Sequence, residues 1–392
     1  MTKKKVLQIP YGTKDILPGE ARAKREIEVS IVNNFIAWGY DEVETPTFEY
    51  LDTFIDEGTG LLSDSFKFFD RNNQALVLRS DMTKPIARMV ATRLNDGRQI
   101  KRISYLANIF RYEETQAGRQ CEFSQAGVEL MGAAEPSADA EVLALAIASL
   151  RVAGLTDFTV SLGHSDFITG LMEEAGLNEE QAEELKKRVL QHDMVGLETL
   201  LTTLPMTENL RSIFQRLLLL HGDEAMLDEL QETVKNDKSR QALRNLSEIY
   251  QLAKAYGVAD VVRFDLSLIR SLDYYTGMVF EVYTFDMGFP ICGGGRYDNM
   301  MQAFGKSCPA TGFAVGIDRI MLVLARQKKL ETKTEFDVFV AWSYGKLAQA
   351  IAEGMELRKN GKTVKVATTA STRTVAENEK KANDCKELVF IE

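Results

Sequence analysis

Carboxylate, amide and guanidinium side chains recur along one stretch of this sequence. Gln125, Gly127 and Glu129 stand at alternating positions, as do Arg111 and Glu113. Successive side chains of a strand point to opposite faces, so each set would share one face of an extended segment. Groups of these types, set around the space that a glycine leaves, can hold a small zwitterionic ligand. The competing interpretation is a solvated hairpin whose polar residues line up by chance.

Helices and strands alternate in the part of the chain that must position these residues. Apolar side chains at helical spacing predict a helix over residues 21–38, which Gly39 would end. Residues 41–46 are predicted to form a strand that a proline closes. A further strand over residues 76–83 would lead into a helix that Pro85 opens. The polar stretch itself reads as a strand, a loop and a second strand.

The middle and the end of the chain have different patterns. Residues 178–256 carry leucine and isoleucine at three- and four-residue intervals and few turn residues, so we interpret them as a helical insertion. Strand character returns at residues 277–285. Residues 336–391 alternate strand, helix, strand, helix and strand, which predicts a small βαβαβ unit.

Composition limits the class of protein. The 392 residues are 45% hydrophobic and 27% charged, as in a globular protein of two or three domains. The four cysteines and three histidines are scattered, which argues against disulfides and against a metal site. The net charge of −10 does not favour nucleic acid. With no signal segment and no apolar run long enough to span a bilayer, we expect a cytoplasmic protein without membrane contact.

A run of three glycines, Gly293–Gly295, can be interpreted in two ways. It lacks the lysine and hydroxyl residue that end a phosphate-binding loop of nucleotide hydrolases. Adjacent glycines allow a backbone to approach a flat ligand closely and to adopt positive φ. They are equally typical of a turn between strands, and the residues alone do not separate the two interpretations.

Taken in order, the motifs resemble the histidyl-tRNA synthetases, a class II aminoacyl-tRNA synthetase family, over nearly the whole chain. The matching segments are residues 11–18 (an N-terminal signature), 39–46 (motif 1), 110–129 (motif 2), 309–319 (motif 3), and 268–277 and 293–298 (two histidine-binding signatures). The resemblance implies an α+β fold. It would have the antiparallel sheet core of class II synthetases, a helical insertion and a small, truncated α/β domain at the C-terminus.

The same resemblance implies domain boundaries. The sheet core would occupy residues 1–175 and 258–330, with the helical insertion between them at residues 176–257. The truncated domain, similar to an anticodon-binding domain, would occupy residues 335–392. Its charges balance, so we expect no tRNA binding.

Residues at the histidine-binding positions of the family follow from the motifs. They are Asp81, Thr83, Arg111, Gln125, Glu129, Arg270, Tyr274 and Tyr275. A carboxylate with neutral acceptors, as at Asp81, Thr83 and Gln125, suits the α-amino group of histidine. The carboxylate of Glu129, together with Tyr274 and Tyr275, suits the imidazole ring, which has two nitrogens.

The arginines match further positions of the family. Arg111 matches the motif 2 arginine that touches the substrate carboxylate, and Arg270 matches the catalytic arginine. Arg119 and Arg319 would be vestigial nucleotide contacts. Arg319, like Tyr274, could instead be a packing or surface residue.

Departures from the synthetase pattern change the expected function. Asp81 stands where the synthetases carry glutamate, and Thr115, Cys121 and Ser271 replace other usual residues. A carboxylate shortened by one methylene group loosens a fixed reaction geometry. Binding tolerates such changes better than catalysis, because only groups that stabilise the transition state drive the chemical step.

These departures resemble the synthetase-like paralogues that serve as regulatory subunits of ATP phosphoribosyltransferase. Residues 78–88 and 137–142 match segments that recur in that family. The resemblance implies a non-catalytic chain, without cofactor or metal, that dimerises through the motif 1 region and partners a short-form catalytic subunit. It would support the first step of histidine biosynthesis and sense histidine. The alternative is a divergent histidyl-tRNA synthetase that forms histidyl-adenylate at Arg111, Arg270 and Arg319.

Overall fold

The structure is a computed structural model. It describes residues 7–54, 65–94, 97, 99–112, 120–269, 275–332 and 335–392. The chain divides into two compact units. One comprises Met1–Asp15 and Lys24–Leu330, and the other comprises Ile16–Ala23 and Glu331–Glu392.

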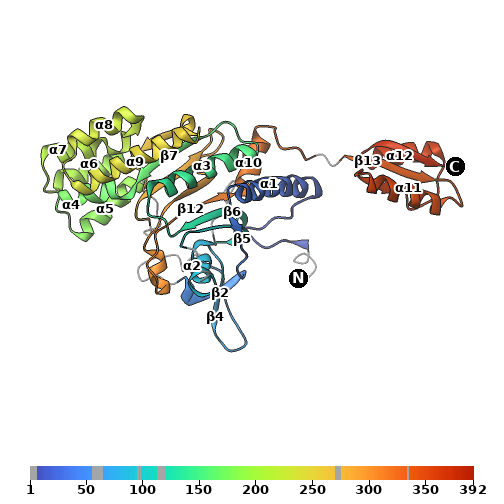
Figure 1. Ribbon diagram of the computed structural model, residues 1–392, viewed down its shortest axis with the longest axis horizontal. Coiled ribbons are helices and arrows are strands. Elements are labelled where there is room, and N and C mark those ends of the chain that lie inside the picture. The colour runs from blue at the N-terminus through green and yellow to red at the C-terminus, as the bar shows by residue number, and fades with distance from the viewer. Residues whose placement is uncertain are drawn as a thin grey trace. The chain divides into compact units, whose positions relative to one another are not determined.

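A nine-stranded sheet forms the centre of the larger unit (Figure 1). Its strand order is β1-β5-β6-β12-β11-β10-β7-β9-β8. The strands are β1 (Asp41–Glu42), β5 (Lys101–Phe110), β6 (Glu122–Met131), β7 (Thr159–His164), β8 (His221–Gly222), β9 (Val262–Asp265), β10 (Met278–Tyr283), β11 (Cys292–Arg296) and β12 (Ala310–Gly316). Neighbours are antiparallel except β1 with β5 and β7 with β9. The predicted sheet core is confirmed.

The polar stretch of the sequence forms the β5–β6 hairpin, as predicted. Ala126 and Val128 of β6 belong to the larger hydrophobic core of this unit. Because side chains alternate along a strand, Gln125, Gly127 and Glu129 face the opposite side of the sheet. The hairpin therefore presents its polar residues together on one face, away from that core.

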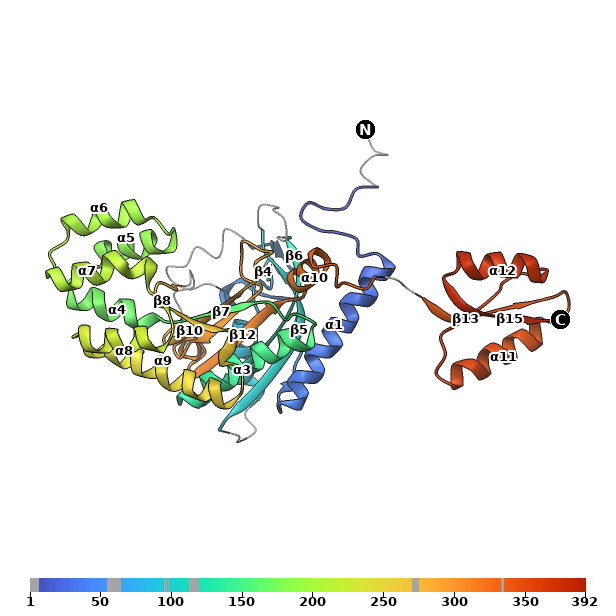
Figure 2. The ribbon, with the colours of Figure 1, turned by 90° about the horizontal axis from the view of Figure 1, so that it is seen from above.

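Helices cover both faces of the sheet. Helices α1 (Pro18–Ala37), α3 (Pro136–Val152) and α10 (Ile317–Arg326) lie on one face and share the larger core with it (Figures 1 and 2). Helix α2 (Thr83–Thr92) packs on the other face, in a smaller core that includes residues of β5. The polar face of β6 lies on the side of α2.

The predicted elements at the start of the chain exist, with shifted bounds. Helix α1 begins at Pro18 rather than at residue 21, because proline suits the first turn of a helix. It ends before Gly39, whose φ of +82° favours glycine. The strand predicted over residues 41–46 is only two residues long, as β1. The strand predicted over residues 76–83 stops at Leu78, so Asp81 lies in the turn before α2.

That turn follows a small antiparallel sheet, in the order β2-β4-β3. Its strands are β2 (Phe48–Tyr50), β3 (Lys67–Phe69) and β4 (Ala75–Leu78). Arg79 fixes the end of β4, because its buried guanidinium donates to the carbonyl oxygens of Asn108 and Thr45, at 2.8 and 2.9 Å. The turn that carries Asp81 is thus tied to the β5 strand of the large sheet.

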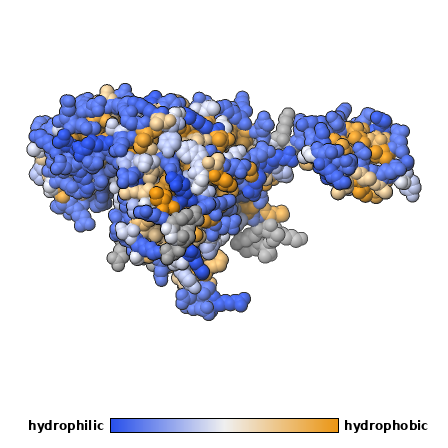
Figure 3. All heavy atoms as spheres, in the orientation of Figure 1, coloured by the Kyte–Doolittle hydropathy of each residue, from blue (hydrophilic) through white to orange (hydrophobic). Residues whose placement is uncertain are grey.

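The segment predicted to be helical is helical, with one interruption at β8, which pairs with β9. Its helices are α5 (Glu179–Leu190), α6 (Met194–Thr203), α7 (Glu208–Arg216), α8 (Glu224–Thr233) and α9 (Asp237–Ala255), and α4 (Ser165–Glu174) precedes it. Side chains of Asn178, Asp193, Thr207, Asp223 and Asn236 accept backbone N–H groups at the starts of α5 to α9. Apolar stripes point inward, and the visible outer face is mostly hydrophilic (Figure 3).

The C-terminal unit has the predicted βαβαβ order. Its elements are β13 (Phe336–Trp342), α11 (Leu347–Lys359), β14 (Val364–Val366), α12 (Arg373–Ala382) and β15 (Cys385–Ile391). The strands are parallel, in the order β14-β13-β15. Val338, Val340, Ala350 and Ala376 belong to a hydrophobic core of this unit. Across the described ranges of the chain, none of the helices combines the length and apolar character needed to cross a membrane.

The space beside Gly127 is filled by the protein itself. A Cβ atom at this position would overlap the hydroxyl of Tyr105, which pairs with Gly127 across the hairpin, and the carbonyl oxygen of Phe313. The expectation that Gly127 leaves a gap for a ligand is therefore wrong. The glycine admits the phenol ring of a neighbouring strand.

Gly127→Ala should destabilise the protein by about 1–3 kcal/mol, because an added methyl group must displace buried atoms of two neighbouring strands. Urea unfolding measures the change. Gly288→Ala is the matched control, since a Cβ at the exposed Gly288 meets no atom within 4 Å. Equal unfolding free energies for the two variants would contradict this account of Gly127.

Candidate functional site

A pocket of about 500 Å³ opens on the polar face of the sheet. Its lining comes from the β4–α2 turn, from strands β5, β6, β10, β11 and β12, and from helix α10. Leu190 at the end of α5 also lines it, so the helical segment contributes to the wall. The pocket brings together these predicted site residues: Asp81, Thr83, Arg111, Gln125, Glu129, Tyr275 and Arg319. Arg119, Arg270 and Tyr274 lie outside the described residues.

Glu129 is the most deeply buried acid of the pocket, with 2% of its surface exposed. The hydroxyl of Tyr297 donates to its Oε2 atom, and the side chain of Thr83 is also hydrogen-bonded to it. Burial raises the pKa of the carboxyl group to about 8, although both hydrogen bonds act in the opposite direction. The group is therefore poised between its neutral and charged forms near physiological pH.

Gly312 provides the room for this carboxyl group. Gly312 lies on β12, the strand next to the β6 strand that carries Glu129. A Cβ atom on Gly312 would overlap Oε2 of Glu129. The glycine lies opposite Glu129 in the register of the two strands. A larger residue here would push the carboxylate away from Tyr297.

Asp81 places a second acid in the pocket. Its Oδ1 atom accepts the backbone N–H of Lys84 at 3.1 Å, at the start of α2. Burial raises the pKa of Asp81, while this hydrogen bond and the charge of Arg111 oppose the increase. The negative charge of Asp81 also contributes to the raised pKa of Glu129. Two carboxyl groups that share a site favour a cationic ligand group between or beside them.

Gln125 leaves a hydrogen-bond acceptor unused. Its Oε1 atom is buried and has no hydrogen-bond partner within the described part of the chain. A buried acceptor without a donor costs free energy, on the order of 1–3 kcal/mol. A ligand N–H group in the pocket would remove this cost.

The two arginines of the pocket are held by backbone carbonyls and aromatic rings. Nε of Arg111 donates to Ser80 at 2.7 Å, and its guanidinium lies 5.7 Å from the ring centre of Phe123. Arg319 likewise donates to the carbonyl oxygen of Pro290 at 2.6 Å and lies over Phe289. Each therefore combines packing with a place in the pocket wall, where it can meet an anionic ligand group.

Two tyrosines of the pocket, Tyr105 and Tyr297, were not predicted as site residues, although Tyr297 lies within the signature at residues 293–298. Tyr105 is almost fully buried, and its pKa lies well above the usual value because of burial and the nearby Glu129. Tyr297 reaches Glu129 from just beyond β11. The pairing of Tyr105 with Gly127 could have been found from the hairpin register, but the contact of Tyr297 joins residues far apart in the sequence.

The glycine run lies inside strand β11, and none of Gly293–Gly295 has positive φ. The turn and the positive φ expected for this run are therefore wrong. The close approach of its backbone to a ligand stays a prediction, and Gly293 belongs to the pocket lining. A Cβ atom on Gly295 would lie 2.8 Å from ring atoms of Tyr275. The glycine accommodates a pocket tyrosine.

Comparison with known proteins places this geometry in a family. The sequence matches the family described as Histidyl-tRNA synthetase over residues 12–320. A protein of Desulforamulus reducens is named ATP phosphoribosyltransferase regulatory subunit and is 42% identical over 92% of this chain and 90% of its own. A protein of the same name from Acetivibrio thermocellus is 40% identical over 91% of this chain and 86% of its own.

The chain belongs to the ATP phosphoribosyltransferase regulatory subunit family. A crystal structure of a Bacillus halodurans protein, titled as a regulatory subunit of this kind or histidyl-tRNA synthetase, covers all of both chains with a TM-score of 0.89 and 33% identity. The predicted family and its synthetase-like fold are confirmed. Membership assigns the chain a regulatory role in histidine biosynthesis rather than a catalytic one.

Replacing Glu129 should change how folding stability depends on pH. The folded-state pKa is about 8, against 4.5 for an unperturbed glutamate, so the proton stays on the folded protein over this range. The contribution of this carboxyl group to the free energy of unfolding is full below about pH 4.5 and is lost as the pH rises through 8. Relative to Glu129→Gln, wild-type protein should therefore lose unfolding free energy across this window.

Urea unfolding from about pH 5 to pH 9 measures the effect. Glu353→Gln, which removes an exposed carboxylate of α11, controls for the loss of one charge. Parallel pH profiles for wild type and Glu129→Gln would refute the assignment of the raised pKa to Glu129.

Proposed function

We propose that this chain is the histidine-sensing subunit of an ATP phosphoribosyltransferase, with the pocket as the site that binds free histidine. The observation that carries the proposal is the pair of acceptors on one face of β6. Gln125 offers an unused buried oxygen, and Glu129 offers a carboxyl group held by Tyr297. Two separate acceptors suit the two different nitrogen-bearing groups of histidine.

Each part of histidine finds a suitable partner in the pocket. The α-amino group would contact Gln125, Asp81 and Thr83, where a carboxylate and neutral acceptors favour an ammonium ion. The imidazole would contact Glu129 and Tyr275, and the carboxylate would contact Arg111. The contributions of Arg270 and Tyr274 stay predictions, as do the nucleotide contacts of Arg119 and Arg319.

We infer that the partner is a short-form catalytic subunit, since the relatives are named as regulatory subunits of a phosphoribosyltransferase. Histidine would act as the end product that lowers activity. Such control requires that ligand binding and the active assembly shift each other's equilibrium.

Further expectations concern self-association, nucleic acid and compartment. We infer that two copies associate through residues 39–46, since β1 lies at an edge of the sheet with both residues exposed. The net charge of −10 supports the absence of tRNA binding. All four cysteines are free thiols, which supports a reducing cytoplasm.

Reconstitution tests the proposed function. A short-form phosphoribosyltransferase that is inactive alone should gain activity when this chain is added, and histidine should then inhibit it. Histidine-dependent exchange of pyrophosphate into ATP by the purified chain would instead identify a synthetase and overturn the proposal.

Tyr297→Phe should raise the inhibitory histidine concentration roughly 10- to 100-fold, the effect of losing a hydrogen bond to a charged or ionisable group. Titration of the reconstituted enzyme with histidine measures the shift. Tyr250→Phe removes a hydroxyl outside the pocket lining and should leave the inhibition curve in place. Identical curves for Tyr297→Phe and wild type would exclude this pocket as the histidine site.

A further inference from the structure

A buried ion pair lies behind the pocket, at the end of β11. Arg296 donates from Nε to Oδ2 of Asp139 on α3, at 3.0 Å, and from Nη1 to Oδ1 of Asp298, at 3.1 Å. Asp139 is 1% exposed and Arg296 is 6% exposed. The carbonyl oxygen of Ala133 accepts a further bond from Nη1 at 3.1 Å. The guanidinium is thus held from three directions.

This ion pair is not optimised for folding stability. Nη2 of Arg296 is buried without a hydrogen-bond partner among the described residues. Removing two charges from water costs free energy that their attraction often only balances. A role in fixing local geometry explains this cluster of Arg296, Asp139 and Asp298 better than a gain in folding stability.

The residue between the two ends of the cluster is Tyr297. Arg296 and Asp298 are held on the α3 side, whereas the hydroxyl of Tyr297 reaches Glu129 in the pocket. Oδ1 of Asp298 also accepts the backbone N–H of Ala310 at 3.0 Å, which ties the segment to β12. With both neighbours fixed, the backbone of Tyr297 has little freedom to move.

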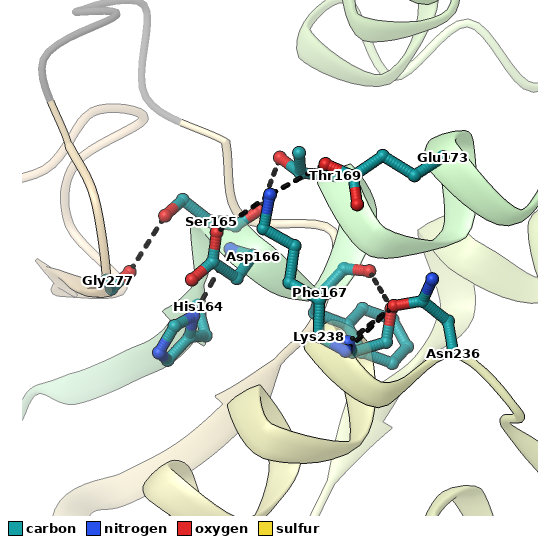
Figure 4. A network of polar contacts seen from close by, with 10 residues as sticks. His164, Ser165, Asp166, Phe167, Thr169, Glu173, Asn236, Lys238 and Gly277 are labelled. Atoms are coloured by element: carbon teal, nitrogen blue, oxygen red, sulfur yellow. Dashed lines mark hydrogen bonds and ion pairs between the residues drawn. The ribbon is translucent and has the colours of Figure 1, made fainter.

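The same cluster holds the segment that follows Tyr275. Thr276 donates its backbone N–H to the carbonyl oxygen of Arg296 at 2.8 Å, and its Oγ1 accepts the N–H of Asp298 at 2.9 Å. On its other side, Gly277 accepts from the backbone N–H and the hydroxyl of Ser165, at 2.9 and 3.2 Å (Figure 4). A Cβ atom on Gly277 would lie 2.9 Å from Cδ of Arg296.

We propose that Arg296 is a positioning residue of the ligand pocket: clamped between Asp139 and Asp298, it fixes Tyr297 and Tyr275 without touching the ligand. The proposal rests on the proposed function for its ligand, histidine. Side chains already in their bound positions lose less conformational entropy when the ligand binds. The affinity of the pocket therefore depends on an ion pair that faces away from it.

Arg296→Lys tests the proposal, because lysine keeps the charge but lacks the planar fork that meets two carboxylates. Calorimetric titration of the full chain with histidine should give a roughly 10- to 100-fold weaker affinity. Arg102→Lys is the matched control. Arg102 holds Glu141 of the same helix α3 through two bonds, at 2.7 and 2.8 Å, and does not line the pocket. It should leave the affinity unchanged.

A double-mutant cycle separates positioning from general destabilisation. If Arg296 acts mainly through Tyr297, then Arg296→Lys combined with Tyr297→Phe should weaken histidine binding much less than the product of the two single effects. Fully independent effects on affinity would overturn the proposal. Should Arg296→Lys fail to fold by circular dichroism, Asp139→Asn takes its place in the cycle.

A measurement without histidine separates this inference from the proposed function. The infrared carbonyl band of protonated Glu129 is identified by its loss in Glu129→Gln. It should shift in Arg296→Lys in the same direction as in Tyr297→Phe, and should stay in place in Arg102→Lys. If wild-type protein binds no histidine but the band shifts as described, the proposed function fails and the positioning role stands. An unshifted band in folded Arg296→Lys overturns the positioning role.

Discussion

The buried carboxyl group of Glu129 is the constraint to which the surrounding elements are fitted. Strand β6 places the group in the middle of a wide sheet, and β12 makes room for it with Gly312. The chain beyond β11 supplies the hydroxyl of Tyr297, and the start of α2 supplies Thr83. Because a buried acid without such partners would destabilise the fold, these four elements can vary only together.

The alternation of residue types along the sequence was enough to predict the parts of the site that lie on one strand. The alternation of Gln125 and Glu129 predicted their common face, and the hairpin around them is confirmed. Helix α3 was not predicted, because it is buried on nearly all sides and lacks an amphipathic stripe. The contact of Tyr297 with Glu129 was also missed, since it depends on how distant strands are ordered in the sheet.

Glycines were the residues whose meaning changed most between sequence and structure. From the sequence alone, Gly127 indicates a gap, and the run at Gly293–Gly295 indicates either a close approach of the backbone to a flat ligand or a turn. In the folded sheet, Gly127 admits the phenol of Tyr105, Gly295 the ring of Tyr275 and Gly312 the carboxyl of Glu129. A glycine inside a strand thus marks a large neighbour across the sheet, which the sequence of that strand does not reveal.

The outermost strands of the sheet, β1 and β8, are each two residues long. An open sheet edge is a template on which another molecule can add a strand, and short, charged edges suppress such growth. Asp41 and Glu42 make up β1, so joining two copies edge to edge would bring their carboxylates against each other. A short edge strand with two acidic residues thus disfavours the addition of another strand at this position, which would extend the sheet.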